Sequence, residues 1–264
     1  MHFTVDHDLH IHSGLSACSN DPNQSKERIL QYALDNGLKT VCVTDHFWDE
    51  KVAGSSKWYA PQNFDHISKI LPLPQAEGVR FLFGCETELD KNLKLGVSRQ
   101  RMEELDFIII PTTHFYSKSF VLLPDEAESS EGRARAWVRR LEGVLNMDLP
   151  FRKVGIAHLT CTCIAPTREE YLKVLGLLPE KEMERLFIKA AKLGVGIELN
   201  EDDMEFADEE SHTVLRIYRI AKWCGCKFYC GSDAHHPGLF EKAKEVFERA
   251  VKLLDLQETD KFII

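Results

Sequence analysis

Short apolar segments alternate with amphipathic segments along the chain. Each apolar segment is rich in β-branched or aromatic residues and is bounded by glycine or polar residues, which is the pattern of a buried strand. This pattern predicts strands at residues 5–11, 40–44, 79–85, 107–110, 154–157, 195–199 and 227–230.

Between these strands, apolar residues recur every three or four positions, as they do on one face of a helix. Gly37 and Gly194 follow two of these stripes and indicate helix C-termini. The three clearest stripes are Ile29, Leu30, Ala33 and Leu34; Met183, Leu186, Phe187, Ala190 and Ala191; and Phe240, Ala243, Val246, Phe247, Ala250 and Val251. Each stripe is expected to lie on a helix and to face the sheet.

Seven strand–helix units in series predict an α/β fold with a parallel sheet and right-handed crossovers. An incomplete or distorted barrel closes such a series better than an open sheet, and a chain of 264 residues fits one barrel. Because no repeat or flexible linker marks a boundary, residues 1–264 are expected to form a single domain. Residues 117–132 contain Pro124 and four acidic residues and are expected to form a long loop of the functional or mobile kind.

Composition narrows the possible partners and the compartment. The formal net charge of −9 argues against a general affinity for nucleic acid. No apolar run reaches the roughly 20 residues of a membrane span, and the first residues lack the basic and apolar regions of a signal peptide. A cytoplasmic protein is therefore expected, with its eight cysteines as reduced thiols. The Cys161/Cys163 and Cys224/Cys226 pairs are spaced more closely than a zinc knuckle, which predicts buried apolar thiols.

Six of the seven expected strands end in histidine, glutamate or aspartate. These side chains include His10, His12, His46, Glu86, His114, His158, Asp233 and His235. In a parallel barrel the C-terminal strand ends open on one face, which is where such folds place their chemistry. A single histidine beside a strand is more often a core or surface residue than a ligand, but the joint pattern predicts a metal site.

The spacing within the motifs supports metal binding. His10 and His12 are two residues apart, so on a strand they point the same way, and Asp233 and His235 repeat this geometry. Imidazoles and carboxylates together suit Zn, Mn or Fe. Two divalent ions held close together need an anionic bridge, which Glu86 can supply.

The order of these motifs resembles that of the PHP family, named for polymerase and histidinol phosphatase domains. The motifs are Asp-Leu-His-x-His-Ser, Thr-Asp-His, a glutamate after the third strand, single histidines after the fourth and fifth, and Gly-Ser-Asp-Ala-His, and they span residues 8–235. The resemblance implies a distorted (β/α)7 TIM-like barrel that hydrolyses phosphoesters with two or three divalent ions (Zn, Mn or Fe). It also implies the ligands, which are His10, His12, Glu86 and Asp233 for one ion, Glu86, His114 and His158 for a second, and His46 and His235 for a third.

Cys18 marks a departure from the family pattern. Members with three ions place a histidine six residues after the second histidine of the opening motif, and Cys18 occupies that position. A thiolate can bind zinc, so we predict that Cys18 lies within reach of the third ion, beside His46 and His235. The alternative is a thiol that packs under its loop and leaves a weak or empty third site. Ser16 is followed by Ala17, where family members commonly have Ser-Asp.

The expected reaction is hydrolysis of a small-molecule phosphate monoester by a metal-bridging hydroxide, without a covalent intermediate. Glu86, Asp233 and His235 are the expected catalytic residues, and His235 or a water on the third ion is expected to protonate the leaving group. Arg168 and Lys118 are the candidate phosphate-binding cations, although a surface position is the commoner role for each of these residues.

Histidinol-phosphate phosphatase is the narrower expectation, because the chain has a matching length and its segment 105–108, which leads into His114, is similar. Those enzymes usually continue Asn-Thr-Ser-Gly-Leu-Arg after the sixth strand, whereas Asn200 here precedes the acidic stretch 201–205. That stretch could meet a substrate amine or form a solvated loop. Three other functions remain as alternatives. A catalytically weakened regulatory module would have lost metal ligands, and a nuclease acting on polymeric DNA would carry a basic surface. An amidohydrolase usually has its histidines in another order along the chain.

Overall fold

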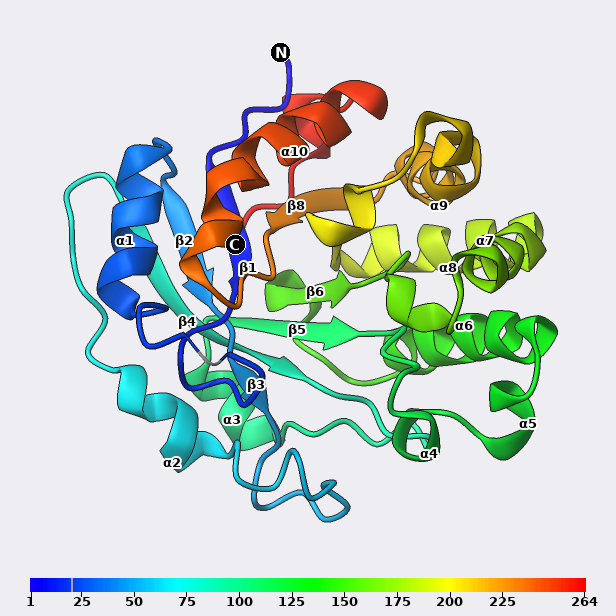
Figure 1. Cartoon of the computed structure of the whole chain (residues 1–264), viewed down its shortest axis with the longest axis horizontal. Helices are drawn as coiled ribbons and strands as arrows, with labels where there is room; N and C mark the ends of the chain where they lie inside the picture. The colour runs from blue at the N-terminus through cyan, green and yellow to red at the C-terminus, as the bar shows by residue number, and fades with distance from the viewer. Residues whose placement is uncertain (20) are drawn as a thin grey trace.

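The computed structural model describes residues 1–19 and 21–264. Its centre is one parallel sheet whose strands run in the order β1-β2-β4-β5-β6-β7-β8 and curl into a distorted barrel (Figure 1). The strands are β1 (His7–Ile11), β2 (Thr40–Val43), β4 (Arg80–Thr87), β5 (Phe107–Pro111), β6 (Val154–Ala157), β7 (Gly196–Asn200) and β8 (Lys227–Gly231). The short strand β3 (His46–Phe47) follows β2 and pairs with the end of β4. The expected distorted barrel is confirmed.

The barrel is nearly closed where β1 approaches β8. Asp233 donates its backbone N–H to the carbonyl of His10 at 2.7 Å, and His12 donates its own to the carbonyl of Ala234 at 3.1 Å. Both hydrogen bonds lie at the C-terminal ends of the strands. The first and last strands of the series therefore meet at the level of the predicted metal ligands.

The strand boundaries follow the sequence prediction to within two residues, and the difference at the end of β4 has a local cause. β4 continues to Thr87, past the expected end at residue 85, because His46 and Phe47 of β3 pair with Glu86 and Thr87. The added pairing holds the backbone of Glu86 inside the sheet. A glutamate that was predicted to follow the strand is thus part of it.

Helices cover the outside of the barrel (Figure 1). They are α1 (Lys26–Asp35), α2 (Phe64–Ile67), α3 (Arg99–Glu104), α4 (Lys118–Val121), α5 (Pro124–Ala127), α6 (Ser130–Leu145), α7 (Arg168–Leu177), α8 (Glu180–Leu193), α9 (Ser211–Trp223) and α10 (Phe240–Leu253). The predicted stripes of α8 and α10 face the core, with Ala191 and Val246 only half-buried. Among the described residues, no helix combines the length and the apolar character needed to cross a membrane.

Two local predictions are wrong. Leu34 was expected to face the sheet, but it is 45% exposed, and Tyr32 takes the buried place on α1 with its ring stacked 4.2 Å from that of Phe240. Residues 117–132 are not a long loop, because they contain α4, α5 and the start of α6. Glu126 explains much of this order: it accepts from the Leu123 N–H at 2.9 Å and from Arg139 at 2.8 Å.

The interior of the barrel is packed with apolar side chains. This inner cluster consists of Leu9, Cys42, Leu82, Phe107, Ile109, Ala157, Tyr229 and Phe262. Phe262 comes from the C-terminal segment, which is tied to β8 by the hydrogen bond from the Phe262 N–H to the Phe228 carbonyl at 2.8 Å. The interior of the barrel is therefore a filled core and not a pore.

Candidate metal centre

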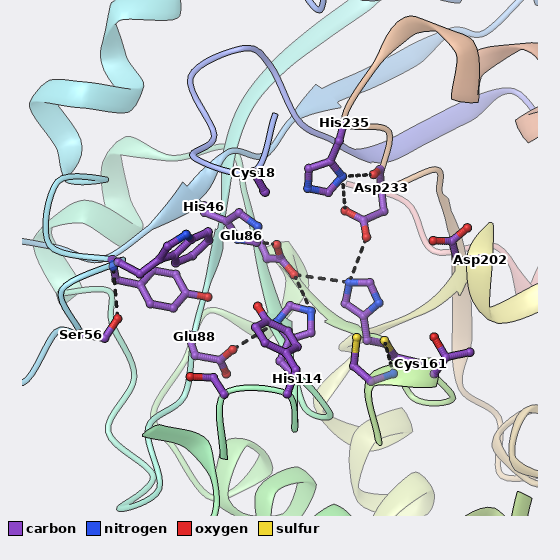
Figure 2. Close-up of a pocket in the computed structure, with 17 residues that line it drawn as sticks. Cys18, His46, Ser56, Glu86, Glu88, His114, Cys161, Asp202, Asp233 and His235 are labelled. Carbon is purple, nitrogen blue, oxygen red and sulfur yellow. Dashed lines mark hydrogen bonds and ion pairs between the residues drawn. The ribbon is translucent and has the colours of Figure 1, made fainter. Parts of the chain in front are cut away.

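The predicted ligands converge on one cavity at the C-terminal ends of the strands (Figure 2). The cavity has a volume of about 430 Å³, and its walls include His46, Glu86, His114, His158, Asp233 and His235. His10 and His12 are fully buried beside it. The strand-end pattern of the sequence thus corresponds to one site in space.

The first cluster joins the opening motif to the closing motif of the chain. His12 Nε2 lies 2.9 Å and His10 Nε2 lies 3.3 Å from Asp233 Oδ1, while His12 Nε2 lies 3.4 Å from Glu86 Oε2. One ligand atom from each of these four residues lies within 4.8 Å of the others. Asp233 adopts a left-handed backbone with φ of 52°, a costly conformation for a non-glycine residue that turns its carboxylate into the cluster.

Glu86 connects this first cluster to a second one. Its Oε1 lies 3.7 Å from His114 Nε2 and 3.5 Å from His158 Nε2, and these three residues form their own compact group. Its Oε2 faces His12 instead. Neither oxygen of Glu86 has a hydrogen-bond partner among the described residues, although the side chain is only 1% exposed. A buried carboxylate in this state fits a bridge between two cations.

A third cluster brings together His12, His46 and His235, whose nitrogen atoms lie within 4.8 Å of one another. The rings of His12 and His235 stack at 4.1 Å between centroids. His46 Nδ1 also lies 2.8 Å from Glu86 Oε2, so this cluster adjoins the other two. The predicted pair His46 and His235 is therefore joined by His12.

Cys18 lines the same cavity but does not belong to any of these compact groups. Figure 2 shows it above Glu86 and beside His46 on the loop that follows β1. Cys18 is exposed at the rim of the cavity, but partial desolvation of its thiol, together with the negative charges of Glu86 and Asp233, raises the thiol pKa to about 12. The protein alone therefore keeps this thiol protonated, and its place at the third ion stays a prediction.

The charges of the two central carboxylates are balanced by histidines. Burial opposes ionisation of Glu86, but His46 and His10 hold the pKa of its carboxyl well below the ordinary value. Burial is outweighed in the same way at Asp233, where His10 and His235 lower the pKa. Both carboxylates are thus ionised, which is the form that binds divalent cations.

Sequence analysis missed the residues that orient the histidines of these clusters. His10 Nδ1 lies 2.6 Å from Glu198 Oε1, and His114 Nδ1 lies 3.1 Å from Glu88 Oε2. Such contacts fix the imidazole tautomer and leave the Nε2 atom free for a metal. A signal did exist for Glu198, because it is a charged residue within an otherwise apolar strand.

His12 is oriented by a hydroxyl group in place of a carboxylate. Its Nδ1 lies 2.8 Å from Ser16 Oγ, and Ser16 in turn donates to Asp45 Oδ1 at 2.7 Å. Asp45 belongs to the second strand-end motif, Thr-Asp-His. The aspartate in that motif therefore supports the loop after β1, while the histidine that follows it enters the cavity.

His158 stands beside two further residues that could hold a cation, Cys161 and Asp203. Its Nδ1 lies 4.0 Å from Asp203 Oδ1. Cys161 is buried as predicted, but Cys163 is only half-buried, and both residues line the cavity. The sequence did not predict that these two cysteines line the cavity, because they come after the strand-end residue His158 and not at the strand end itself.

The acidic stretch 201–205 serves more than one purpose. Glu201 Oε1 pairs with Lys242 at 3.1 Å, and Glu205 pairs with the same lysine. Asp203 is buried and points toward His158. Asp202 lines the cavity. Of the two alternatives for this stretch, a wholly solvated loop is therefore wrong.

The structure does not bring the predicted phosphate-binding cations into the cavity. Arg168 Nε donates to Glu210 Oε1 at 2.9 Å, and the guanidinium lies 4.6 Å from the centre of the Tyr171 ring. Lys118 is exposed at the start of α4. Over residues 1–19 and 21–264, no lysine or arginine lines the cavity.

Comparison with known proteins agrees with this geometry. A model of the PHP domain matches residues 8–262. A probable phosphatase from Caldicellulosiruptor bescii is 21% identical over 234 residues, which cover 87% of this chain and 80% of that protein. The crystal structure of histidinol phosphate phosphatase from Lactococcus lactis, complexed with zinc, L-histidinol and phosphate, matches with a TM-score of 0.55 and 18% identity, over 93% of this chain and 94% of that chain. The last match shows a shared fold.

Proposed function

The chain belongs to the PHP domain family, and from this premise we propose that it is a metal-dependent phosphoesterase that hydrolyses a small-molecule phosphate monoester. The observation that carries the proposal is Glu86. It is buried, all of its ion-pair contacts in the described part of the chain are with histidines, and its two oxygens face two separate histidine clusters. This arrangement supports two divalent transition metal ions (Zn, Mn or Fe) at bridging distance.

Divalent ions in these clusters would activate water and offset the charge of the phosphoryl group. The protein positions the groups around them. His235 Nδ1 donates to the carbonyl of Asp233 at 2.6 Å, which leaves the lone pair of its Nε2 free to contact an ion. To protonate the leaving alkoxide, this nitrogen would first have to take up a proton from a water molecule. Glu86 and Asp233 supply the negative charge that holds the ions.

A third ion is proposed at His46 and His235, because the only free nitrogen of His12 already faces the first cluster. Cys18, on the wall of the same cavity, is proposed as a further ligand of this ion. Zinc binding there would require the thiol to lose its proton, which a nearby cation favours.

A phosphatase screen tests the proposal. Purified protein is reconstituted with Mn, Zn or Fe and assayed with histidinol phosphate, nucleoside phosphates and an aryl phosphate, while elemental analysis reports the metal content. Hydrolysis should require metal and should return when metal is restored after chelation. Reconstituted protein that holds well under about one transition metal ion per chain, or that cleaves no monoester, would refute the proposal.

Histidinol phosphate is the finer candidate, and Asp202 favours it. The Asp202 carboxylate lies across the cavity from Ser56 (Figure 2), and it forms no ion pair in the described part of the chain. An alcohol that carries a protonated amine would supply the missing cation. Asp202→Asn should therefore raise KM for histidinol phosphate and leave KM for an aryl phosphate unchanged. An equal change for both substrates would contradict this role.

The other functional classes have weaker support. A regulatory module that had lost catalysis would show broken clusters, whereas the His, Glu and Asp residues of all three clusters converge here. A nuclease that binds polymeric DNA needs a basic groove, and the cavity of this acidic chain has no lysine or arginine on its described wall.

A further inference from the structure

Tyr59 lines the metal cavity and carries a buried hydroxyl group that lacks a hydrogen-bond partner among the described residues. The residue lies in the loop between β3 and α2, lines the cavity and is only 4% exposed. Its Oη has no hydrogen-bond partner among the described residues. Burying a hydroxyl in this way is costly unless a ligand completes the hydrogen bond.

The ring of Tyr59 is fixed by aromatic neighbours on several sides. Its centroid lies 4.6 Å from that of Trp58, 5.9 Å from that of Phe120 and 6.1 Å from that of Trp48. It also meets the ligand His46 edge-on at 6.1 Å between centroids. The hydroxyl is therefore held in place before any substrate arrives.

The loop backbone adds to this rigidity. The Tyr59 N–H donates to Ser56 Oγ at 3.2 Å, and the Tyr59 carbonyl accepts from the Gln62 N–H at 2.8 Å. Figure 2 shows this part of the loop, marked by Ser56, on the opposite side of Glu86 from Asp202. A phosphate bound near Glu86 would thus have the loop of Tyr59 at its side.

The composition of the cavity gives this hydroxyl a role. A phosphate monoester carries two negative charges near neutral pH, and phosphate sites usually add arginine, lysine or other donors to the metal ions. Along the described wall neither lysine nor arginine is present. A phenol keeps its proton at neutral pH and can donate a hydrogen bond to a negatively charged oxygen.

We propose that Tyr59 is a catalytic residue whose hydroxyl donates a hydrogen bond to a non-bridging phosphoryl oxygen, in the role that an arginine or lysine would otherwise fill. This inference rests on the proposed phosphoesterase function. In the transition state, the uncharged Tyr59 hydroxyl would stabilise negative charge on the phosphoryl oxygens that face away from the ions. No bond to Tyr59 forms or breaks in the reaction.

Tyr59→Phe tests the proposal, because it removes the hydroxyl and keeps the ring packing. Tyr229→Phe is the matched control: its hydroxyl is also buried without a partner among the described residues, but it lies in the inner apolar cluster and not on the cavity wall. Both variants and the wild type are loaded with the same metal. Metal content, Tm, the Kd of inorganic phosphate, and kcat and KM for an aryl phosphate are then measured.

The expected result is that Tyr59→Phe keeps its metal and its Tm but loses about 10²-fold in kcat, as when one oxyanion donor is removed. Its affinity for inorganic phosphate should fall as well, while Tyr229→Phe resembles the wild type. The inference would be overturned if Tyr59→Phe kept the wild-type kcat and phosphate affinity. It would also be overturned if kcat and phosphate affinity fell only in proportion to a lower metal content. Wild-type protein that holds metal but hydrolyses no monoester would instead refute the proposed function, and the phosphate Kd would still test Tyr59.

Discussion

Glu88→Gln should weaken both the fold and the metal centre, because Glu88 holds two other side chains in place. Its Oε1 accepts from Arg140 at 2.8 Å, and its Oε2 lies 3.1 Å from His114 Nδ1. A glutamine has only one acceptor oxygen. Either its amide group faces the guanidinium of Arg140, or the amide faces His114 and removes the acceptor that keeps the proton on Nδ1.

The size of the effect follows from burial. Arg140 is 0% exposed and Glu88 is 1% exposed. Depriving such a buried charge of its partner costs about 3–5 kcal/mol of unfolding free energy. At about 2–4 °C per kcal/mol, Tm should fall by about 6–20 °C. Since Arg140 keeps its contacts to the carbonyls of Thr112, Leu89 and Val121, the lower part of that range is expected. Losing the contact that orients a ligand histidine should cost about 10–100-fold in metal affinity.

Thermal unfolding and metal titration against a competing chelator measure the two effects. Glu210→Gln is the matched control, because Glu210 also pairs with an arginine, Arg168, but near the surface and outside the cavity. An exposed pair contributes about 0–1 kcal/mol, and this one touches no ligand. If Glu88→Gln matched the control in Tm and the wild type in metal affinity, the structural role assigned to Glu88 would be wrong.

Three further changes test other parts of the centre. Glu86→Ala removes the residue that faces both histidine clusters, so turnover should fall by several orders of magnitude with an unchanged circular dichroism spectrum, and near wild-type turnover would rule out the bridge. Cys18→Ser should lower the zinc content by about one ion per chain if the thiolate binds the third ion; unchanged zinc in elemental analysis would indicate a two-metal centre. Arg168→Ala should leave KM for an aryl phosphate unchanged, because Glu210 holds the guanidinium outside the cavity; a large rise in KM would return Arg168 to the phosphate site.

The convergence of the strand-end histidines could be predicted from the sequence because the fold repeats one simple rule. Each parallel strand delivers its C-terminal end to the same face, so strand-end residues such as His12, His46 and His158 must meet. A two-residue spacing on a strand then decides which side chains share a direction. These two local rules account for the three clusters without any knowledge of long-range contacts.

The residues that support the ligands could not be found in this way. Glu88 and Asp203 act through contacts with partners far along the chain, such as Arg140, which donates to Glu88 from 52 positions later. Tyr59 lies in an irregular loop, where no periodic pattern predicts the direction of a side chain. The helical order of residues 117–132 depends in the same way on Glu126 and its long-range partner Arg139.

The hydrogen bonds that close the barrel also complete the first metal cluster, so fold and site depend on each other. The bond from the Asp233 N–H to the His10 carbonyl joins the two ends of the strand series at 2.7 Å. The same bond fixes Asp233 in its left-handed conformation, with its Oδ1 2.9 Å from His12 Nε2. Metal bound at this cluster would bind the folded state alone and would therefore stabilise the closed barrel. Loss of metal should accordingly loosen the contact between β1 and β8 before it disturbs the strands on the opposite side of the barrel.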